Sequence, residues 1–178
     1  RASGSRSMTG SPVPPRRAIT SRRPPVDPVG EPAQASAMPD TVPRAELPRD
    51  LANRLRAVLG ERGLLTDPEA IAAHGADWRN LFPGTALAVL RPASTAECAE
   101  AVRLCADSGI AIVPQAGNTS LCGGSTPLGR GDEVVLSGAR MNRILDVDPS
   151  DMTMVVEAGA VLAAAQQAAE TAGCLFPL

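Results

Sequence analysis

The feature that most constrains the fold is an alternation of short apolar segments and amphipathic segments that begins at residue 86. Short apolar segments bounded by turn residues are typical of strands, and they lie at 86–92, 110–114, 133–137, 143–148 and 153–159. Two segments carry apolar residues at helical spacing, 94–109 and 160–173. The order strand, helix, strand, loop, three strands and helix predicts an α+β fold, in which a mixed sheet is flanked by helices.

The helix predicted at 94–109 has clear start and stop signals. Glu97 stands three residues after Ser94, which is the spacing of a capping box, and Gly109 is expected to end the helix. The cysteines on this helix are expected to act as small apolar residues, and the expected apolar face is Cys98, Ala101, Val102 and Cys105. For the last helix, the expected packing side is Val161, Leu162, Ala165 and Ala169.

Residues 45–85 are expected to hold two N-terminal helices and an irregular lead-in to the sheet. Leucines and a valine at three- and four-residue spacing predict the first helix, with Gly60 or Gly63 at its end. The segment "TDPEAIAAHG" predicts a short second helix, capped by Thr66 or Asp67 with Pro68 at its first position. The following "ADWRNLFPG" fits no regular element and contains the only tryptophan.

Residues 1–44 differ in composition from the rest of the chain. They hold seven arginines against three acids, whereas residues 45–178 hold ten arginines against 16 acids. Ten of the 17 prolines precede Asp50, and such a segment cannot bury enough apolar surface to offset its ordering entropy. We therefore predict a disordered Arg/Pro/Ser-rich tail. Its first 26 residues carry six arginines and no acid, so a mitochondrial transit peptide is the alternative to a cytoplasmic protein with an unstructured leader.

Composition excludes several kinds of chemistry within the 178 residues. The sequence has no lysine, hence no Schiff base and no Walker lysine, and it has no tyrosine. The four cysteines form no C-x-x-C pair and His74 is the only histidine, so we predict no metal site. No apolar stretch approaches the ~20 residues that a membrane span needs. The acidic 45–178 part argues against specific nucleic-acid binding.

The segment "VPQAGNTSLCGGSTP", residues 113–127, is the strongest candidate for a binding site and is called the glycine loop here. It follows a predicted buried strand, where α/β sheets commonly place ligands. Gly117, Gly123 and Gly124 can adopt positive φ, so that successive N–H groups could converge on an anion. The loop matches neither G-x-G-x-x-G nor a P-loop. From composition alone, a flexible linker remains the alternative.

The order of residues in this part of the chain resembles a known family. "PQAGNTSLCGGSTP", "ADWRNLFPG", "DEVVLSGARMNRILDVDPSDMTMVVEAG" and the final "FPL" are similar to the FAD-binding domain of the vanillyl-alcohol oxidase and para-cresol methylhydroxylase superfamily, in particular to FAD-linked D-2-hydroxyacid dehydrogenases. The resemblance implies that residues 86–178 are the N-terminal part of a truncated PCMH-type FAD-binding domain, its first subdomain.

The resemblance also implies which residues hold the cofactor. It places non-covalent FAD against the glycine loop and the end of the chain, through Pro114, Gln115, Ala116, Gly117, Asn118, Thr119, Ser120, Gly123, Gly124, Ser125, Pro177 and Leu178. No histidine lies in the loop to form a histidyl-flavin bond. Ala116 and Ser120 stand where the family usually has glycine, and a positive φ at Ala116 would cost on the order of 1 kcal/mol.

The function that the resemblance implies is FAD-dependent oxidation of a D-2-hydroxyacid. The expected substrate is D-2-hydroxyglutarate, and D-lactate or glycolate is the alternative. Electrons would leave to a separate acceptor. No catalytic residue can be assigned, because the family's catalytic histidines and carboxylates match no position before Leu178. The alternative from another class is a truncated fragment without catalytic activity.

Overall fold

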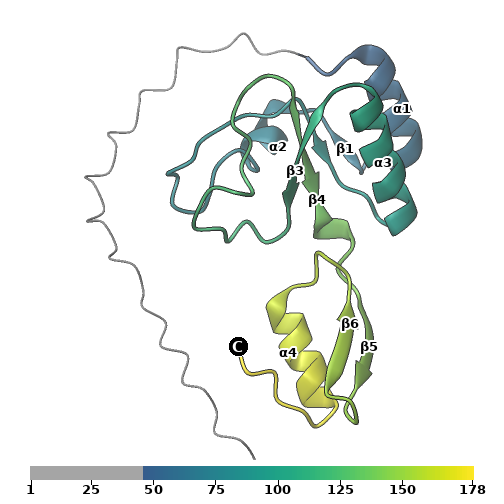
Figure 1. Cartoon of the computed structure of the whole chain (residues 1–178), viewed down its shortest axis with the longest axis vertical. Coiled ribbons are helices and arrows are strands. Elements are labelled where there is room, and N and C mark those ends of the chain that lie inside the picture. Colours follow the sequence, from purple (N-terminus) through teal and green to yellow (C-terminus); the bar gives the residue numbers. More distant parts are fainter. Residues whose placement is uncertain (1–45) are drawn as a thin grey trace, which may run out of the picture. The chain divides into compact units, whose positions relative to one another are not determined.

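The computed structural model describes residues 46–178 (Figure 1). The predicted tail, residues 1–44, lies outside the described residues. The elements are α1 (Arg49–Leu59), β1 (Leu64–Leu65), α2 (Pro68–Ala72), β2 (Val89–Leu90), α3 (Thr95–Asp107), β3 (Ala111–Gln115), β4 (Glu133–Ser137), the 3-10 helix η1 (Gly138–Arg140), β5 (Ile144–Asp148), β6 (Thr153–Val156) and α4 (Leu162–Thr171). The predicted order is confirmed, and β1 and η1 are additions that the sequence pattern did not indicate.

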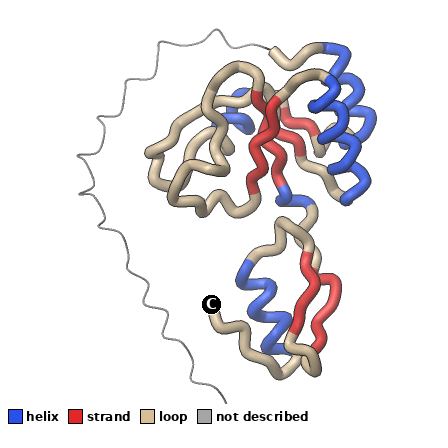
Figure 2. The backbone as a smooth tube through the Cα atoms, viewed as in Figure 1, coloured by secondary structure: helices blue, strands red, loops and turns tan. Residues whose placement is uncertain are grey.

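The first sheet sets the position of the candidate site. Its strand order is β1-β2-β4-β3, with β2, β4 and β3 parallel and β1 antiparallel to β2. Val135 of β4 pairs with Val89 on one side and Val113 on the other. Because β2, β4 and the edge strand β3 are parallel, their carboxyl ends meet at one end of the sheet, and β3 and β4 run there into the glycine loop and η1 (Figure 2).

Helices cover both faces of this sheet. α1 and α3 lie side by side on one face, and α2 lies on the other (Figure 1). Side chains alternate across the strands: Leu90 and Val134 pack under α1 and α3, whereas Val89 and Val135 pack with Ile71 of α2. The mixed sheet flanked by helices that the sequence predicts is therefore confirmed.

The predicted start and stop of α3 are confirmed, but one residue of its predicted apolar face is wrong. Ser94 Oγ accepts from the Glu97 N–H at 3.2 Å, and the Glu97 carboxylate accepts from the N–H of Ala93, one residue earlier than a capping box requires. Val102 is exposed and Leu104 is buried instead, because α3 packs against both α1 and β3. Cys105 is buried, and burial raises the pKa of its thiol, which fits an apolar role.

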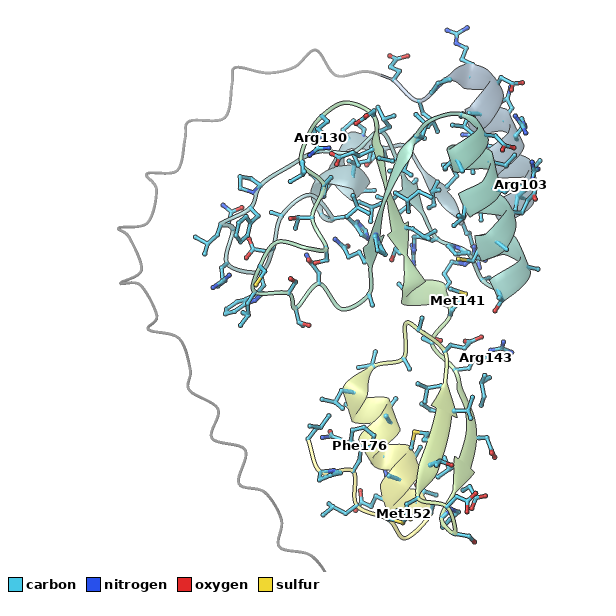
Figure 3. The ribbon with its side chains drawn as sticks, viewed as in Figure 1. Arg103, Arg130, Met141, Arg143, Met152 and Phe176 are labelled. Carbon is cyan, nitrogen blue, oxygen red and sulfur yellow. The ribbon has the colours of Figure 1, made fainter. Side chains whose placement is uncertain are left out.

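The second sheet consists of β5 and β6, paired antiparallel with an irregularity in register between Ile144 and Asp146. α4 packs beside β5, and Met152 lies at the turn between the strands (Figure 3). Ala165 and Ala169 of α4 are buried as predicted. Val161 and Leu162 are exposed, so that part of the prediction is wrong: both lie at the start of the helix, beyond the part of its surface that packs on the strands.

No helix within residues 46–178 is long and apolar enough to cross a membrane.

Candidate cofactor site

The glycine loop begins at the carboxyl end of β3 and presents a run of free backbone donors. Within residues 46–178, the N–H groups of Ala116 to Leu121 donate to no protein acceptor, and the next one, that of Cys122, donates to Ser120 Oγ. Asn118 in the middle of this run has a φ of 51°, a left-handed conformation that asparagine tolerates better than most residues. Adjacent residues of opposite backbone hand turn successive N–H groups toward a common side, which is the arrangement of an anion-binding nest.

The backbone conformation of the loop differs from the expectation at the glycines. Only Gly123 has a positive φ, 69°, among the three loop glycines that were expected to have one. Ala116 does not have a positive φ either, so the methyl group at this position causes no backbone strain. The left-handed residue of the N–H run is instead Asn118, which the sequence pattern did not indicate.

The segment 74–84, called the lead-in segment, is attached to the glycine loop. The buried Gln115 amide donates to the carbonyl of His74 at 3.1 Å and to that of Ser125 at 2.8 Å. The Asn118 amide donates to the carbonyl of Ala76 at 2.7 Å, and its oxygen accepts from the Ser125 hydroxyl at 2.8 Å. These two side chains shape the loop, so their direct contribution to a ligand would come from the backbone.

Close packing fixes the rest of the loop against the same segment. A Cβ on Gly123 would lie 2.7 Å from Cγ of Phe82, and a Cβ on Gly84 would lie 1.8 Å from the carbonyl oxygen of Pro127. In contrast, a Cβ on Gly117 would meet nothing closer than 3.8 Å, and one on Gly124 nothing closer than 3.9 Å. The loop is therefore packed on the side of the lead-in segment and open at Gly117 and Gly124.

Asp77 organises the lead-in segment itself. Its carboxylate has no exposed surface and accepts from the N–H groups of Leu81 at 2.7 Å and Phe82 at 3.0 Å. Burial acts to raise the pKa of Asp77, but the hydrogen bonds from these two amides and from Arg79 outweigh it and hold the pKa below its usual range. Asp77 is therefore an ionised, buried group, which gives the segment a fixed shape.

A cavity of about 330 Å³ lies beside the loop at the carboxyl ends of the parallel strands. Three of the predicted site residues line it, Pro114, Gln115 and Ala116, and further lining residues come from the end of β4 and the chain after it: Ser137, Gly138, Met141 and Ala158. Met141 follows η1 directly (Figure 3). Sequence reasoning missed these four residues. For Ser137, Gly138 and Met141 the available signal is the turn "SGARMN", which leaves a strand parallel to β3 at the same edge, whereas nothing in the sequence pattern indicates Ala158.

The other predicted site residues divide into two groups. Gly123 and Gly124 line a neighbouring cavity of about 260 Å³ together with Pro114, and the Thr119 side chain is exposed beside the open N–H run. Pro177 and Leu178 are exposed after α4 and line neither cavity. The Leu178 carbonyl instead accepts from the Gln166 side chain at 2.5 Å. The structure thus gathers ten of the twelve predicted residues in one loop and leaves the last two apart.

The site has the properties that a nucleotide diphosphate requires. Six open N–H groups can solvate phosphate oxygens without a cation, and Pro114 lines two neighbouring cavities. Within the described part of the chain, no three His, Cys, Asp or Glu side chains gather in a way that could hold a metal ion. The fold and the site define an α+β domain with free backbone donors beside two cavities at the carboxyl ends of its parallel strands.

Comparison with known families identifies the cofactor. The family described as "FAD binding domain" matches residues 86–178, which is more than half of the sequence, and the chain belongs to this family. FAD is therefore the cofactor of this domain, and the resemblance seen in the sequence is confirmed.

Curated relatives are longer than this chain. It is 40% identical over 129 residues to "D-2-hydroxyglutarate dehydrogenase, mitochondrial" of Bos taurus, a match that covers 72% of this chain and 23% of the relative. It is 33% identical over 130 residues to "Putative D-lactate dehydrogenase C713.03, mitochondrial" of Schizosaccharomyces pombe, covering 69% and 24%. The chain thus spans about a quarter of the length of these relatives.

Solved structures confirm the fold. Alkyldihydroxyacetonephosphate synthase is similar with a TM-score of 0.66 at 21% identity, over 75% of this chain and 26% of that protein. Substrate-bound p-cresol methylhydroxylase is similar with a TM-score of 0.61 at 20% identity, over 70% and 24%. At such identities the likeness concerns the fold, which is that of the first part of a PCMH-type FAD-binding domain.

Proposed function

We propose that the glycine loop binds the diphosphate of FAD without a covalent bond, and that this chain is the diphosphate-binding part of an enzyme that oxidises a D-2-hydroxyacid. The observation that carries the proposal is the run of six open N–H groups from Ala116 to Leu121. Pro114, Gly123, Gly124 and Ser125 would complete the surface around the cofactor, with Ser137, Gly138 and Met141 on the neighbouring strand end. Pro177 and Leu178 stay in the proposal through the sequence resemblance alone.

In the proposed reaction the 2-hydroxyacid loses a hydride equivalent and a proton and becomes a 2-oxoacid, and the electrons pass on to a separate acceptor. The chemistry that FAD would supply when bound is to accept the hydride equivalent. The residues of this chain would hold the cofactor by dipoles that are already oriented before binding, so little reorganisation is needed. The groups that act on the substrate match no residue of this chain.

D-2-hydroxyglutarate is the proposed substrate, because the Bos taurus relative carries this acid in its name. D-lactate is the second candidate, favoured by the name of the Schizosaccharomyces pombe relative. Both names also contain the word mitochondrial, and together with the arginine-rich first 26 residues they support a mitochondrial location over the cytoplasmic one. Bleaching of the flavin absorbance by either acid, measured on the complete gene product, separates the two substrates.

The diphosphate assignment can be tested on the 178-residue chain by flavin fluorescence. FAD should bind more tightly than riboflavin, which lacks the diphosphate, and ADP should compete whereas adenosine should not. The variant Ala116→Pro removes one N–H donor after an extended residue that tolerates a following proline. Loss of one hydrogen bond to a charged group should raise the Kd for FAD about tenfold or more.

The matched control is Ala116→Gly, which keeps the N–H group and should leave the Kd for FAD within about twofold of the wild-type value. Equal affinities for FAD and riboflavin, or equal effects of the proline and glycine variants, would contradict the diphosphate assignment.

A further inference from the structure

The lead-in segment contacts the glycine loop at regular intervals. Besides the bonds from Gln115 and Asn118, a third bond runs from Nη2 of Arg79 to the carbonyl of Leu121. The attached loop positions are three residues apart, 115, 118 and 121. None of the three attachments uses a loop N–H group, so the N–H groups from 116 to 121 stay free, those of Asn118 and Leu121 included.

Arg79 is the only one of these three attachments in which the lead-in segment supplies the side chain. Its guanidinium links the buried Asp77 carboxylate, 3.5 Å from Nε, to the loop backbone, which Nη2 reaches at the last residue of the N–H run. The guanidinium also lies over the Trp78 ring, 5.7 Å from its centroid. A planar, forked group held on two sides has little freedom to move away.

We infer that Arg79 is a positioning residue for FAD: anchored by Asp77, it fixes the end of the open N–H run at Leu121 and so keeps the glycine loop in the shape that accepts the diphosphate. This inference rests on the proposed function, because it concerns the same loop. It adds a role for a segment of the chain about 40 residues earlier, which no part of the proposal assigns.

The exposure of Arg79 makes the inference testable without unfolding the chain. The Arg79 side chain is 31% exposed, and within residues 46–178 its only partners are the Asp77 carboxylate, the Leu121 carbonyl and the Trp78 ring. Arg79→Ala removes all three contacts and leaves the hydrophobic core intact. Arg62→Ala is a matched control, because Arg62 is exposed and its side chain makes no ion pair or hydrogen bond in the described part of the chain.

The experiment has two readouts on the 178-residue chain and its variants. Backbone order parameters from ¹⁵N relaxation, recorded without FAD, report the motion of loop amides 116–121 directly. In Arg79→Ala these order parameters should fall, and the Kd for FAD should rise about tenfold, the usual scale for losing a hydrogen bond from a charged group. Arg79→Lys, which keeps the charge but not the fork, should recover only part of both effects. Arg62→Ala should change neither.

Unchanged order parameters in Arg79→Ala overturn the inference, even if the affinity for FAD falls, since Arg79 would then act on the cofactor directly. If the loop loosens in Arg79→Ala but the wild-type chain does not prefer FAD over riboflavin, the positioning of the loop stands and the proposed function fails. The two proposals therefore fail in different measurements.

Discussion

Residues 46–140 and residues 141–178 both consist of strands with helices packed on them, but the first region buries many more apolar side chains than the second. Of the 17 hydrophobic residues buried within residues 46–178, only Ala165 and Ala169 lie after residue 140. The first region buries leucines and valines on both faces of its sheet. In the second, apolar side chains remain exposed on β5, β6, α4 and the residues after α4: Leu145, Met152, Val155, Val156, Val161, Leu162, Leu175 and Leu178.

This difference shows which part of the cofactor site has a firm support. The glycine loop is built on the first region, where the sheet is covered on both faces and the lead-in segment adds its own attachments. Met141 and Ala158 line the cavity from the second region, and the sheet beside them buries few apolar side chains. Local stability should therefore fall from α3 to α4, since few buried apolar contacts mean easy local opening.

The largest expected effect comes from deleting the same side chain in the two regions. Leu104 of α3 is 2% exposed and Leu162 of α4 is 49% exposed. Leu104→Ala should lower the free energy of unfolding by about 2–5 kcal/mol, because it leaves a cavity in a packed core. Leu162→Ala should change it by less than about 0.5 kcal/mol. Urea denaturation followed by circular dichroism measures both, and similar losses in the two variants would contradict the contrast.

A smaller effect is expected where the two regions meet. A Cβ on Gly159 would lie 1.9 Å from the carbonyl oxygen of Gly138 and 3.0 Å from that of Met141, whose carbonyl accepts the Gly159 N–H at 2.8 Å. Gly159→Ala should therefore cost about 1–3 kcal/mol as the backbones move apart. It should also increase hydrogen exchange in β5 and β6 more than in α3. Uniform exchange changes along the chain would show that this contact does not join the regions.

The smallest effect concerns the starts of the two helices. α3 begins at the capping Ser94, whereas α4 begins at Val161, which caps nothing and is 62% exposed. Ser94→Ala should cost about 1 kcal/mol, and Val161→Ser should stabilise by about 0.5–1 kcal/mol, since Val161 already has the extended backbone of an N-cap residue. Thermal unfolding of both variants tests this. A destabilised Val161→Ser variant would mean that the exposed valine makes contacts of its own.

The sequence predicted those features that depend only on residues close together in the chain. The caps at Ser94 and Asp67, with Pro68 beside the latter, need only neighbouring residues, and the structure confirms them. β1 has two residues and exists only through its pairing with β2, so no periodic pattern could indicate it. The exposure of Val102 follows from the packing of α3 against two partners, which helical spacing alone does not contain.

The candidate site follows the same rule. The glycine loop was predictable because its residues are consecutive, and its place after β3 follows from the strand pattern. Met141 and Ala158 could not be found in this way, because they reach the cavity only through the neighbouring position of β4 and β3 in the sheet. Asn118, with its left-handed φ, bonds to Ala76 and Ser125, which lie 42 and 7 positions away, so its neighbours in the sequence do not indicate this conformation.

The three attachments of the glycine loop also determine when during folding the site can form. They join residues 41, 42 and 42 positions apart, with β2, α3 and β3 in between. Contacts at such separations form only after the intervening chain has closed, because loop closure costs entropy before the contact stabilises anything. The open N–H run should therefore be among the last parts of the first region to take shape, and uptake of FAD should mark the completion of folding rather than assist its early steps.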